Sequence, residues 1–383
     1  MMQNLKRYYF AFIIILLSSC SDRKEETDKI VINVNAKTEQ LPLSEIITRL
    51  DYIPLESGNA SFIGAISDVH LFDKKYFVLD VGREQITIFT EEGDYNGKIK
   101  FIGNGPGEYS KIDFFDINEF DKTIDIFDIR KGKVLRYDLY GTFVEEIRAR
   151  IICRDFEVTQ KGNYLFYSPD EVNETADHKT LGTGIILMKR NENPKLIAEL
   201  GNVTYHPILT GDSFVQHKDK VYLFSNYTNT IYEINEDQIP REIELDFGID
   251  IDQSFFTSVN HNIEDIRFPY LKLNPFVLHE NLGFTYIYKG KDNSVLIDYN
   301  TGKSKTYRGI KNDLDGGFFV INGHPVNNGS NYISILDSDI MSQYEEYISK
   351  NPKVPFKSDK LDSLKSVMKL NNNNPILVFG STL

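Results

Sequence analysis

One short arrangement of strands recurs along most of this 383-residue chain. Each copy has an apolar strand rich in Tyr, Phe, Ile and Val, then a polar break, a second strand, a turn and a third strand. The copies are Lys75–Gly97, Thr123–Glu146, Asn163–Leu200, Lys220–Leu245 and Leu282–Tyr307. Their turns lie near residues 93, 141, 192, 236 and 301, about 44 to 65 residues apart. Such a repeat restricts the chain to a few architectures.

The repeat predicts an all-β fold, a single β-propeller of about six four-stranded blades. A meander of a few strands cannot bury both of its faces, so the units must pack on one another around an axis. Parallel strands would need a helix in each connection, and the turns here are too short to hold one. Five or seven blades are the alternatives to six.

The remaining strand of each blade is expected just before each copy, at Ile63–Phe72, Ile112–Phe120, Phe156–Thr159, Ile208–Gln216 and Phe276–His279. A sixth unit begins near Phe318, is interrupted by two predicted helices at 339–349 and 358–370, and ends on a strand at 375–379. An early strand, Ile30–Val34 or Tyr52–Leu55, is expected to pair with that last strand. Such pairing closes the ring and removes the exposed edges of its end blades.

The first twenty residues are built differently from the rest. Lys6 and Arg7 precede an apolar run, Tyr8–Leu17, that is too short to cross a bilayer as a helix but fits a secretory signal peptide. The following Leu17-Ser18-Ser19-Cys20 resembles the lipobox of bacterial lipoproteins, in which the cysteine is lipidated and becomes the mature N-terminus. A signal peptide cut elsewhere is the alternative.

These features divide the chain into three parts. Residues 1–19 are the predicted lipoprotein signal peptide, and residues 20–40 are the lipidated cysteine with a polar tether and a first strand. Residues 41–383 form the propeller, with a helical insertion at 339–370. The acidic tether resembles the export signals of surface lipoproteins in Bacteroidetes-type bacteria. We therefore expect an exported lipoprotein of the outer membrane or cell surface, with the periplasmic face as the alternative.

Three further stretches carry a family resemblance. They are Leu43–Ile47 leading into Tyr52–Glu56, the Gly-rich connector Ile102–Tyr109, and the connector Asn312–Gly317. Together they resemble the six-bladed β-propeller lipoprotein family of Bacteroidetes, which is similar in style to NHL-repeat propellers. The resemblance implies a fold and a compartment, but its motifs are turn motifs and imply no activity.

Composition excludes several classes of partner and mechanism. The net charge of −13 and the lack of a basic stripe predict no nucleic-acid partner. With Cys20 lipidated, Cys153 is the single remaining cysteine and is expected to be a small buried residue. No H-E-x-x-H or G-x-S-x-G motif is present, so serine, cysteine and zinc mechanisms lack support.

Two groups of residues receive a structural interpretation. The stretch Gly103-Asn104-Gly105-Pro106-Gly107 is followed by a strand and has no Walker lysine, so it is not a phosphate loop. Its three glycines are expected to supply positive φ angles for a tight crossing between blades. Asp113, Asp116, Asp125 and Asp128 alternate with apolar residues and are expected to line solvated strand faces or turns.

Geometry offers one candidate binding site. In a propeller, the connectors from each outer strand to the next inner strand share one face, around the mouth of the central pore. They are predicted at 103–109, 150–155, 201–207, 248–267 and 311–317. Convergent polar groups there would suit a small molecule, glycan or peptide. The candidate ligand-binding residues are Asn104, Glu108, Arg154, Asp155, His206, Arg267, Asp313 and Asp315, with His261 nearby. Any propeller places polar loops there, so a purely structural role is the alternative.

Two functions are consistent with these features. The preferred one is a non-enzymatic binding propeller on the cell envelope, attached to the membrane through its lipid and recognising an envelope glycan, peptide or protein. The alternative is a metal-dependent hydrolase, similar to a lactonase, with oxygen ligands for calcium at the pore mouth. We expect no cofactor in the first case and calcium in the second.

Overall fold

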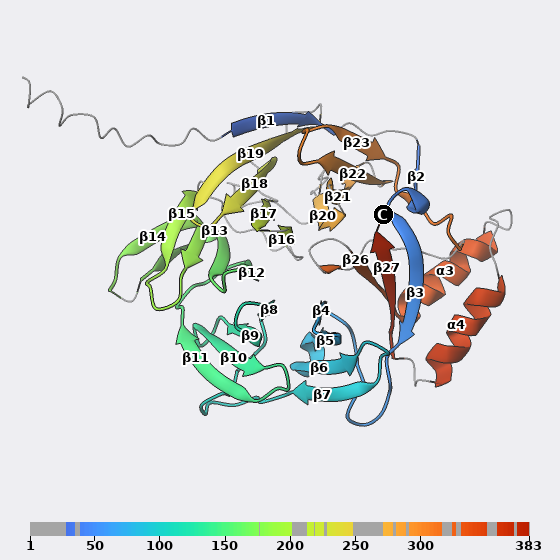
Figure 1. The fold of residues 1–383 in the computed structure, drawn as a ribbon, viewed down its shortest axis with the longest axis horizontal. Coiled ribbons are helices and arrows are strands. Elements are labelled where there is room, and N and C mark those ends of the chain that lie inside the picture. The colour runs from blue at the N-terminus through green and yellow to red at the C-terminus, as the bar shows by residue number, and fades with distance from the viewer. Residues whose placement is uncertain are drawn as a thin grey trace, which may run out of the picture.

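A computed structural model gives the fold. It describes residues 28–34, 39–175, 177–200, 213–217, 219–225, 228–247, 271–278, 281–288, 291–315, 324–326, 331–350, 358–370 and 374–382. Six antiparallel sheets surround a common axis as the blades of a propeller (Figure 1). This confirms the predicted fold class and the predicted number of blades.

The first three blades follow the chain in order. Blade one contains β4 (Asp68–Phe72), β5 (Lys75–Asp80), β6 (Gln85–Thr90) and β7 (Tyr95–Ile99). Blade two contains β8 (Phe114–Asn118), β9 (Thr123–Asp128), β10 (Lys133–Asp138) and β11 (Phe143–Arg148). Blade three contains β12 (Asp155–Val158), β13 (Tyr164–Glu174), β14 (Thr180–Met188) and β15 (Lys195–Glu199).

The other three blades complete the ring. Blade four contains β16 (Phe214–His217), β17 (Lys220–Phe224), β18 (Thr230–Asn235) and β19 (Gln238–Asp246). Blade five contains β20 (Leu271–Leu278), β21 (Asn281–Tyr288), β22 (Lys291–Asp298) and β23 (Ser304–Tyr307). Blade six contains β25 (His324–Val326), β26 (Asn331–Leu336), β27 (Ile376–Thr382) and, as its outer strand, β3 (Ile47–Pro54).

Apolar layers between neighbouring blades form the core. The layer between blades one and two includes Phe77, Ile126 and Tyr137, and the layer between blades two and three includes Phe127 and Phe166. Comparable layers join the remaining neighbours around the ring. Each blade therefore buries both faces against its neighbours, which one isolated sheet could not do.

The N-terminal part of the chain closes the ring. Strand β3 pairs antiparallel with β27, with Tyr52 opposite Val378. This confirms Tyr52–Leu55 as a closing strand. The other early strand, β1 (Asp28–Asn33), was expected as an alternative partner for the same edge, and that expectation is wrong: β1 pairs in parallel with β19 of blade four.

Between β1 and β3 the chain follows the outside of blade five. There β2 (Leu41–Pro42) pairs in parallel with β24 (Ile310–Lys311). The hydroxyl of Ser304 donates to the carbonyl oxygen of Asn33 over 2.9 Å. We call the two described pieces, Asp28–Val34 and Glu39–Pro54, the N-terminal strap. The strap joins blades four, five and six.

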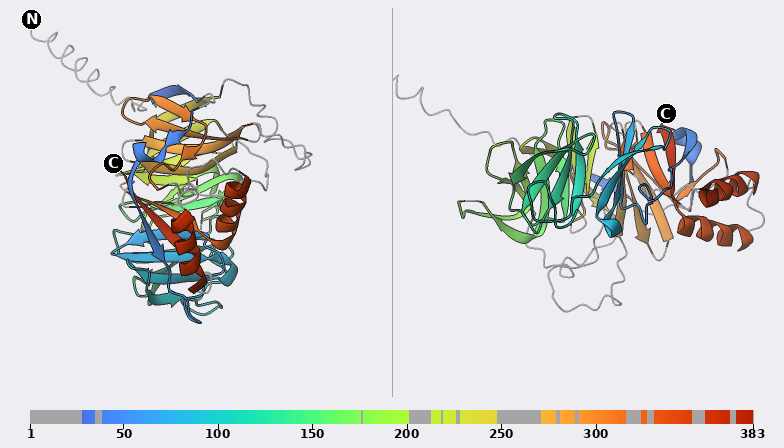
Figure 2. Two further views of the ribbon diagram at one scale, coloured as in Figure 1. Left: turned by 90° about the vertical axis from the view of Figure 1, so that its right-hand side faces the viewer. Right: turned by 90° about the horizontal axis from the view of Figure 1, so that it is seen from below.

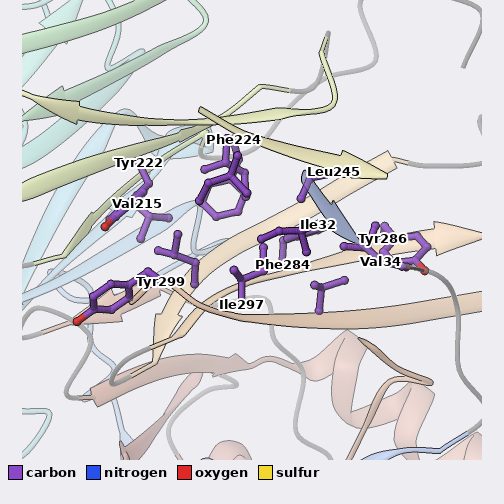
Figure 3. Close-up of a cluster of buried hydrophobic side chains, with 14 of the residues drawn as sticks. Ile32, Val34, Val215, Tyr222, Phe224, Leu245, Phe284, Tyr286, Ile297 and Tyr299 are labelled. Atoms are coloured by element: carbon purple, nitrogen blue, oxygen red, sulfur yellow. Dashed lines mark hydrogen bonds between the residues drawn. The ribbon is translucent and has the colours of Figure 1, made fainter. Parts of the chain in front are cut away.

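The strap is part of the core and not a surface ribbon. Ile32 and Val34 are buried with Phe224, Leu245 and Tyr286 in the layer between blades four and five (Figure 3). The hydroxyl of Tyr286 donates to the carbonyl oxygen of Val34 over 2.8 Å. Because Ile32 and Val34 are buried between blades four and five, β1 stays paired with blade four.

Two helices interrupt blade six, as predicted. They are α3 (Ser338–Lys350) and α4 (Ser358–Leu370), and both lie outside the ring beside this blade (Figures 1 and 2). Met341 and Met368 are buried against Ile376 and Val378 of β27. In the part of the chain that the structure describes, no helix is long and apolar enough to cross a membrane.

The strap provides a direct test of the fold. Ile32 is 2% exposed, whereas its neighbour Val31 is 65% exposed on the same strand. Replacing Ile32 by alanine should lower the free energy of unfolding by about 3 kcal/mol, because it removes buried apolar volume. Val31→Ala, the matched control, should change it by less than about 0.5 kcal/mol. Urea unfolding of both variants measures the difference, and equal effects would show that β1 does not pack between blades four and five.

Candidate functional site

The predicted connector residues are bonded within the molecule. Glu108 folds back on its own loop, where its Oε2 accepts from the amide of Gly105 over 2.8 Å. Asn104 is exposed on the same connector. Lys131 from blade two donates to the carbonyl oxygens of Gly103 and Glu108. The loop is thus held from inside and from the next blade.

The glycines of this connector act differently from the prediction. Only Gly107, with φ +71°, has a positive φ angle, so the prediction for the other two is wrong. A Cβ on Gly103 would lie 2.0 Å from the Glu108 carboxylate, and one on Gly105 would lie 3.2 Å from it. Gly103 and Gly105 are needed for the close approach of that carboxylate.

Arg154 forms an ion pair within blade three, and Asp155 links this blade to blade four. The guanidinium of Arg154 forms a two-pronged ion pair with Asp170, whose side chain is 1% exposed. Asp155 accepts from its neighbouring amide of Phe156 and, through Oδ2, from the amides of Ser213 and Phe214 in blade four. Asp155 therefore links the inner strands of two consecutive blades.

Asp313 and Asp315 both contact the N-terminal strap. Asp313 accepts from the amide and the hydroxyl of Ser44, over 2.9 and 2.7 Å. These bonds, the one from the hydroxyl foremost, lower the pKa of Asp313. Asp315 accepts from the hydroxyl of Tyr52 over 2.9 Å. The binding role of these connector residues stays a prediction, and His206, His261 and Arg267 lie outside the described residues.

The inner strands carry charged residues that the sequence analysis did not select. In each of the first three blades, one inner-strand amide (of Ser67, Asp113 or Arg154) donates to the carbonyl oxygen at the end of the next strand. Counting three residues onward from each places His70, Asp116 and Glu157 at one equivalent position. The inner strands surround the axis (Figure 1), so this position places titratable residues on the inner strands of three successive blades. Aligning the innermost strands, instead of the three outer ones, would have revealed it.

His70 lies between two carboxylates. Its Nε2 is 3.1 Å from Asp68 Oδ2, and its Nδ1 is 3.5 Å from Asp116 Oδ1 on blade two. The imidazole also contacts the ring of Phe115 edge-on, with 4.7 Å between centroids. Its side chain is 28% exposed, so His70 is accessible in part while both aspartates are more buried.

Asp116 has a raised pKa. It is 7% exposed, and burial raises its pKa to about 6, although His70 and two backbone amides favour the charged form. Those amides belong to Ile117 and to Val158 of blade three, at 2.6 and 2.7 Å. Asp116, Asp125 and Asp128 are buried, so the expectation of solvated strand faces is wrong for them, whereas Asp128 does lie at a turn, where it accepts from the amide of Lys131 over 3.0 Å.

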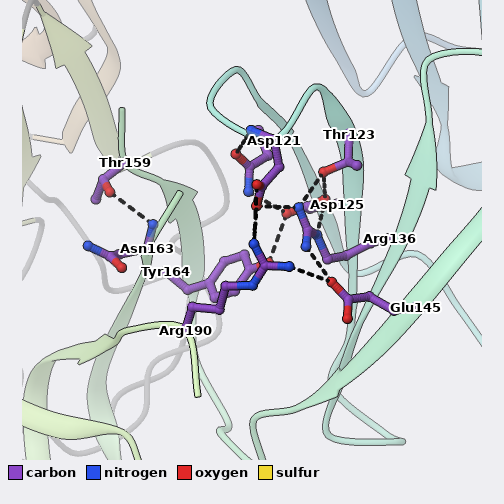
Figure 4. A network of polar contacts seen from close by, with 10 residues as sticks. Asp121, Thr123, Asp125, Arg136, Glu145, Thr159, Asn163, Tyr164 and Arg190 are labelled. Carbon is purple, nitrogen blue, oxygen red and sulfur yellow. Dashed lines mark hydrogen bonds and ion pairs between the residues drawn. The ribbon is translucent and has the colours of Figure 1, made fainter. Parts of the chain in front are cut away.

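A second buried network joins blades two and three. Arg136, 2% exposed, pairs with Asp121, Asp125 and Glu145, and Tyr164 donates to Asp125 over 2.9 Å (Figure 4). Arg190 from blade three reaches Asp121 and Glu145 at the solvent side of the network. Removing Arg136 would leave the Asp125 carboxylate buried without its cation, and an unpaired buried charge is strongly destabilising. The ion pairs of Arg136 therefore stabilise this network.

The remaining chemical candidates are weaker. A groove of about 310 Å³ on the outer rim is lined by Glu145, Arg148, Lys189 and Arg190 with the floor residues Ile147 and Met188. Cys153 is buried, as predicted, and burial raises the pKa of its thiol. Among the described residues, no group of three or more His, Cys, Asp or Glu side chains is arranged to hold a metal ion.

The raised pKa of Asp116 predicts a pH dependence of stability. Because the folded-state pKa of about 6 lies above the unfolded value, the fold favours the protonated acid. The contribution of Asp116 should therefore be largest below about pH 4 and decrease by up to about 3 kcal/mol as pH rises through 6. Asp116→Asn should remove this pH dependence. The free energy of unfolding of wild type should therefore increase relative to that of the variant as the pH falls. Urea unfolding at several pH values measures it, with Glu92→Gln in the exposed turn between β6 and β7 as the control. Parallel slopes would contradict the assignment.

Similarity to known proteins agrees with this architecture. A Bacteroides fragilis protein whose name proposes that it is exported is 18% identical, with 93% of this chain and 99% of that chain covered and a TM-score of 0.68. A DUF4221 family member from Bacteroides vulgatus is 10% identical, with coverage of 91% and 99% and a TM-score of 0.47. A virginiamycin B lyase from Staphylococcus aureus is 11% identical, with coverage of 74% and 80% and a TM-score of 0.41.

The first of these structures supports the propeller fold alone, and the other two are too distant to support an argument. The chain matches no curated protein sequence. A family model described as a domain of unknown function, DUF4934, matches residues 29–381, from the strap through the last strand of blade six. The chain therefore belongs to the DUF4934 family.

Proposed function

We propose that this protein is exported, is lipidated at Cys20, and serves as a non-enzymatic binding propeller on the cell envelope. Export is supported by the apolar run Tyr8–Leu17 and by the name of the structurally similar Bacteroides fragilis protein. Lipidation is supported by the Leu-Ser-Ser-Cys motif that follows the run. The membrane is the first partner, and an envelope glycan, peptide or protein is the second.

The way the charged groups are held supports a binding module. Both oxygens of Asp116 accept backbone amides, and Asp155 accepts amides from two blades. Carboxylates fixed in this way position neighbouring blades and are poorly placed to exchange protons with a substrate. A rigid ring that displays its remaining polar groups is suited to recognition.

The charge of His70, Asp116 and Glu157 supports the choice of ligand class: Asp116 is buried and held by backbone amides, whereas His70 and Glu157 are partly exposed. With Asp68 beside His70, the inner strands of three successive blades present carboxylates around the axis. On a chain with a net charge of −13, this arrangement favours a positively charged ligand. Among the envelope partners, a peptide or protein segment rich in Lys or Arg fits best.

The anchor is tested by removing Cys20. In cells fed a clickable fatty acid, the full chain should take up label and sediment with membranes, and Cys20→Ser should abolish both. Cys153→Ala is the matched control, since this buried cysteine has no part in anchoring. Label retained by Cys20→Ser would refute lipidation at this position.

Ligand class is tested by thermal unfolding of the mature chain with a lysine-rich peptide, citrate or a neutral oligosaccharide. The peptide alone should raise the unfolding midpoint, and Glu157→Gln should weaken this effect several-fold. A probe at 100 times its dissociation constant stabilises by about 2.7 kcal/mol, enough to detect. Glu146→Gln, on an exposed outer strand, controls for non-specific attraction to the acidic chain. Equal responses from both variants would refute binding at the axis.

A further inference from the structure

The outer edge of blade five carries an unusual concentration of positive charge. Residues 300–311 include Lys303, Lys305, Arg308 and Lys311 but no acidic residue, in a chain whose net charge is −13. The three lysines are exposed, and Arg308 is partly exposed. We call these four side chains the basic edge. They lie on or beside β23 and β24, at the rim of the ring (Figure 1).

The N-terminal strap follows this edge closely. Ser304, between Lys303 and Lys305, donates to the carbonyl oxygen of Asn33 over 2.9 Å. The amide of Arg308 donates to the carbonyl oxygen of Glu39, and the carbonyl of Gly309 accepts from the amide of Leu41. Asn33, Glu39 and Leu41 of the strap are therefore fixed directly beside the basic edge.

Chain length limits how far the anchor can be from this rim. Seven residues lie between Cys20 and Asp28, where β1 begins, so eight Cα–Cα steps join the two. A fully extended chain of this length spans at most about 28 Å. Acyl chains on Cys20 therefore hold the rim of blades four and five close to the lipid headgroups, while blades one and two lie across the ring.

The charges on the edges of blades four and five determine which of the two an anionic membrane surface would attract. In the described part of the chain, no carboxylate forms an ion pair with Lys303, Lys305 or Arg308, and Asp313 is the acid near Lys311. On the other side of β1, strand β19 presents Glu242, Glu244 and Asp246, of which the last two are exposed. An anionic surface would attract blade five and repel the edge of blade four.

We propose that the basic edge contacts anionic lipid headgroups of the membrane that holds Cys20. This orientation depends on the proposed lipidation. The propeller then stands on its rim with its axis along the membrane plane. Both ends of the ring face the aqueous phase sideways, open to a partner. A lipid anchor at one residue does not fix orientation, and an electrostatic contact of this kind would do so.

The test is amine footprinting of the mature lipidated chain in vesicles. Phosphatidylcholine vesicles are compared with vesicles that also contain phosphatidylglycerol, and acetylation of each lysine is followed by mass spectrometry. Lys303, Lys305 and Lys311 should react about threefold or more slowly in the anionic vesicles, and high salt should remove the protection. Lys74 and Lys161, with side chains 83% and 66% exposed on blades one and three, should react equally in both.

Charge reversal provides the matched variants. Lys303→Glu with Lys305→Glu should abolish the protection of Lys311, whereas Lys74→Glu with Lys161→Glu should leave it intact. Chains that float with vesicles but show equal lysine reactivity in both lipids would overturn the orientation and leave the anchor standing. Chains that do not float would refute the anchor, and the orientation with it.

Discussion

Closure of the ring by β3 is the constraint on which the rest of this structure depends. A propeller is stable only if its last blade packs on its first, and here the sixth blade lacks an outer strand until residues 47–54 supply it. The pairing joins parts of the chain more than 300 residues apart, so its loop-closure entropy is repaid only when all the blades are in place. Because of that requirement, the second piece of the N-terminal strap is as important as the core. Its residues Leu43, Ile46 and Ile47 are buried with Phe276 and Tyr332 between blades five and six.

Within the closed ring, carboxylates connect one blade to the next. Asp155 takes amides from blade four, Asp116 takes one from blade three, and Asp313 holds the strap through Ser44. A buried carboxylate that accepts two or three amide protons compensates for its lost hydration and fixes backbone direction at the same time. The connector carboxylates Glu108, Asp155 and Asp313 are therefore bonded within the molecule. His70 differs from them in that its side chain is partly exposed.

Much of this fold could be predicted from the sequence, because strand alternation and turn residues are local properties. The strands of the repeated segments and the helices α3 and α4 appear where their patterns placed them. The partner of β1 could not be predicted, since Ile30, Ile32 and Val34 specify a strand with a buried face but not the sheet that buries it. The site was harder still. The close approach of the Glu108 carboxylate to Gly103 depends on how one loop folds back on itself, and the edge-on contact of His70 with Phe115 depends on the packing of another blade, and no local pattern records either.

The strap also gives the anchor a mechanical meaning. A lipid tether attached to a loose terminus would let the propeller rotate freely, and neither face would be presented consistently. Here the chain continues into β1, and Ile32 and Val34 lie in the apolar layer between blades four and five. The carbonyl oxygen of Asn33 accepts from Ser304, which lies between two lysines of the basic edge. With the proposed anchor at Cys20, a force that acts at the membrane would reach the rim of blades four and five through β1. Contact of this rim with the membrane would leave both ends of the propeller open to the aqueous phase. The same segment that closes the fold thus sets how its candidate site is displayed.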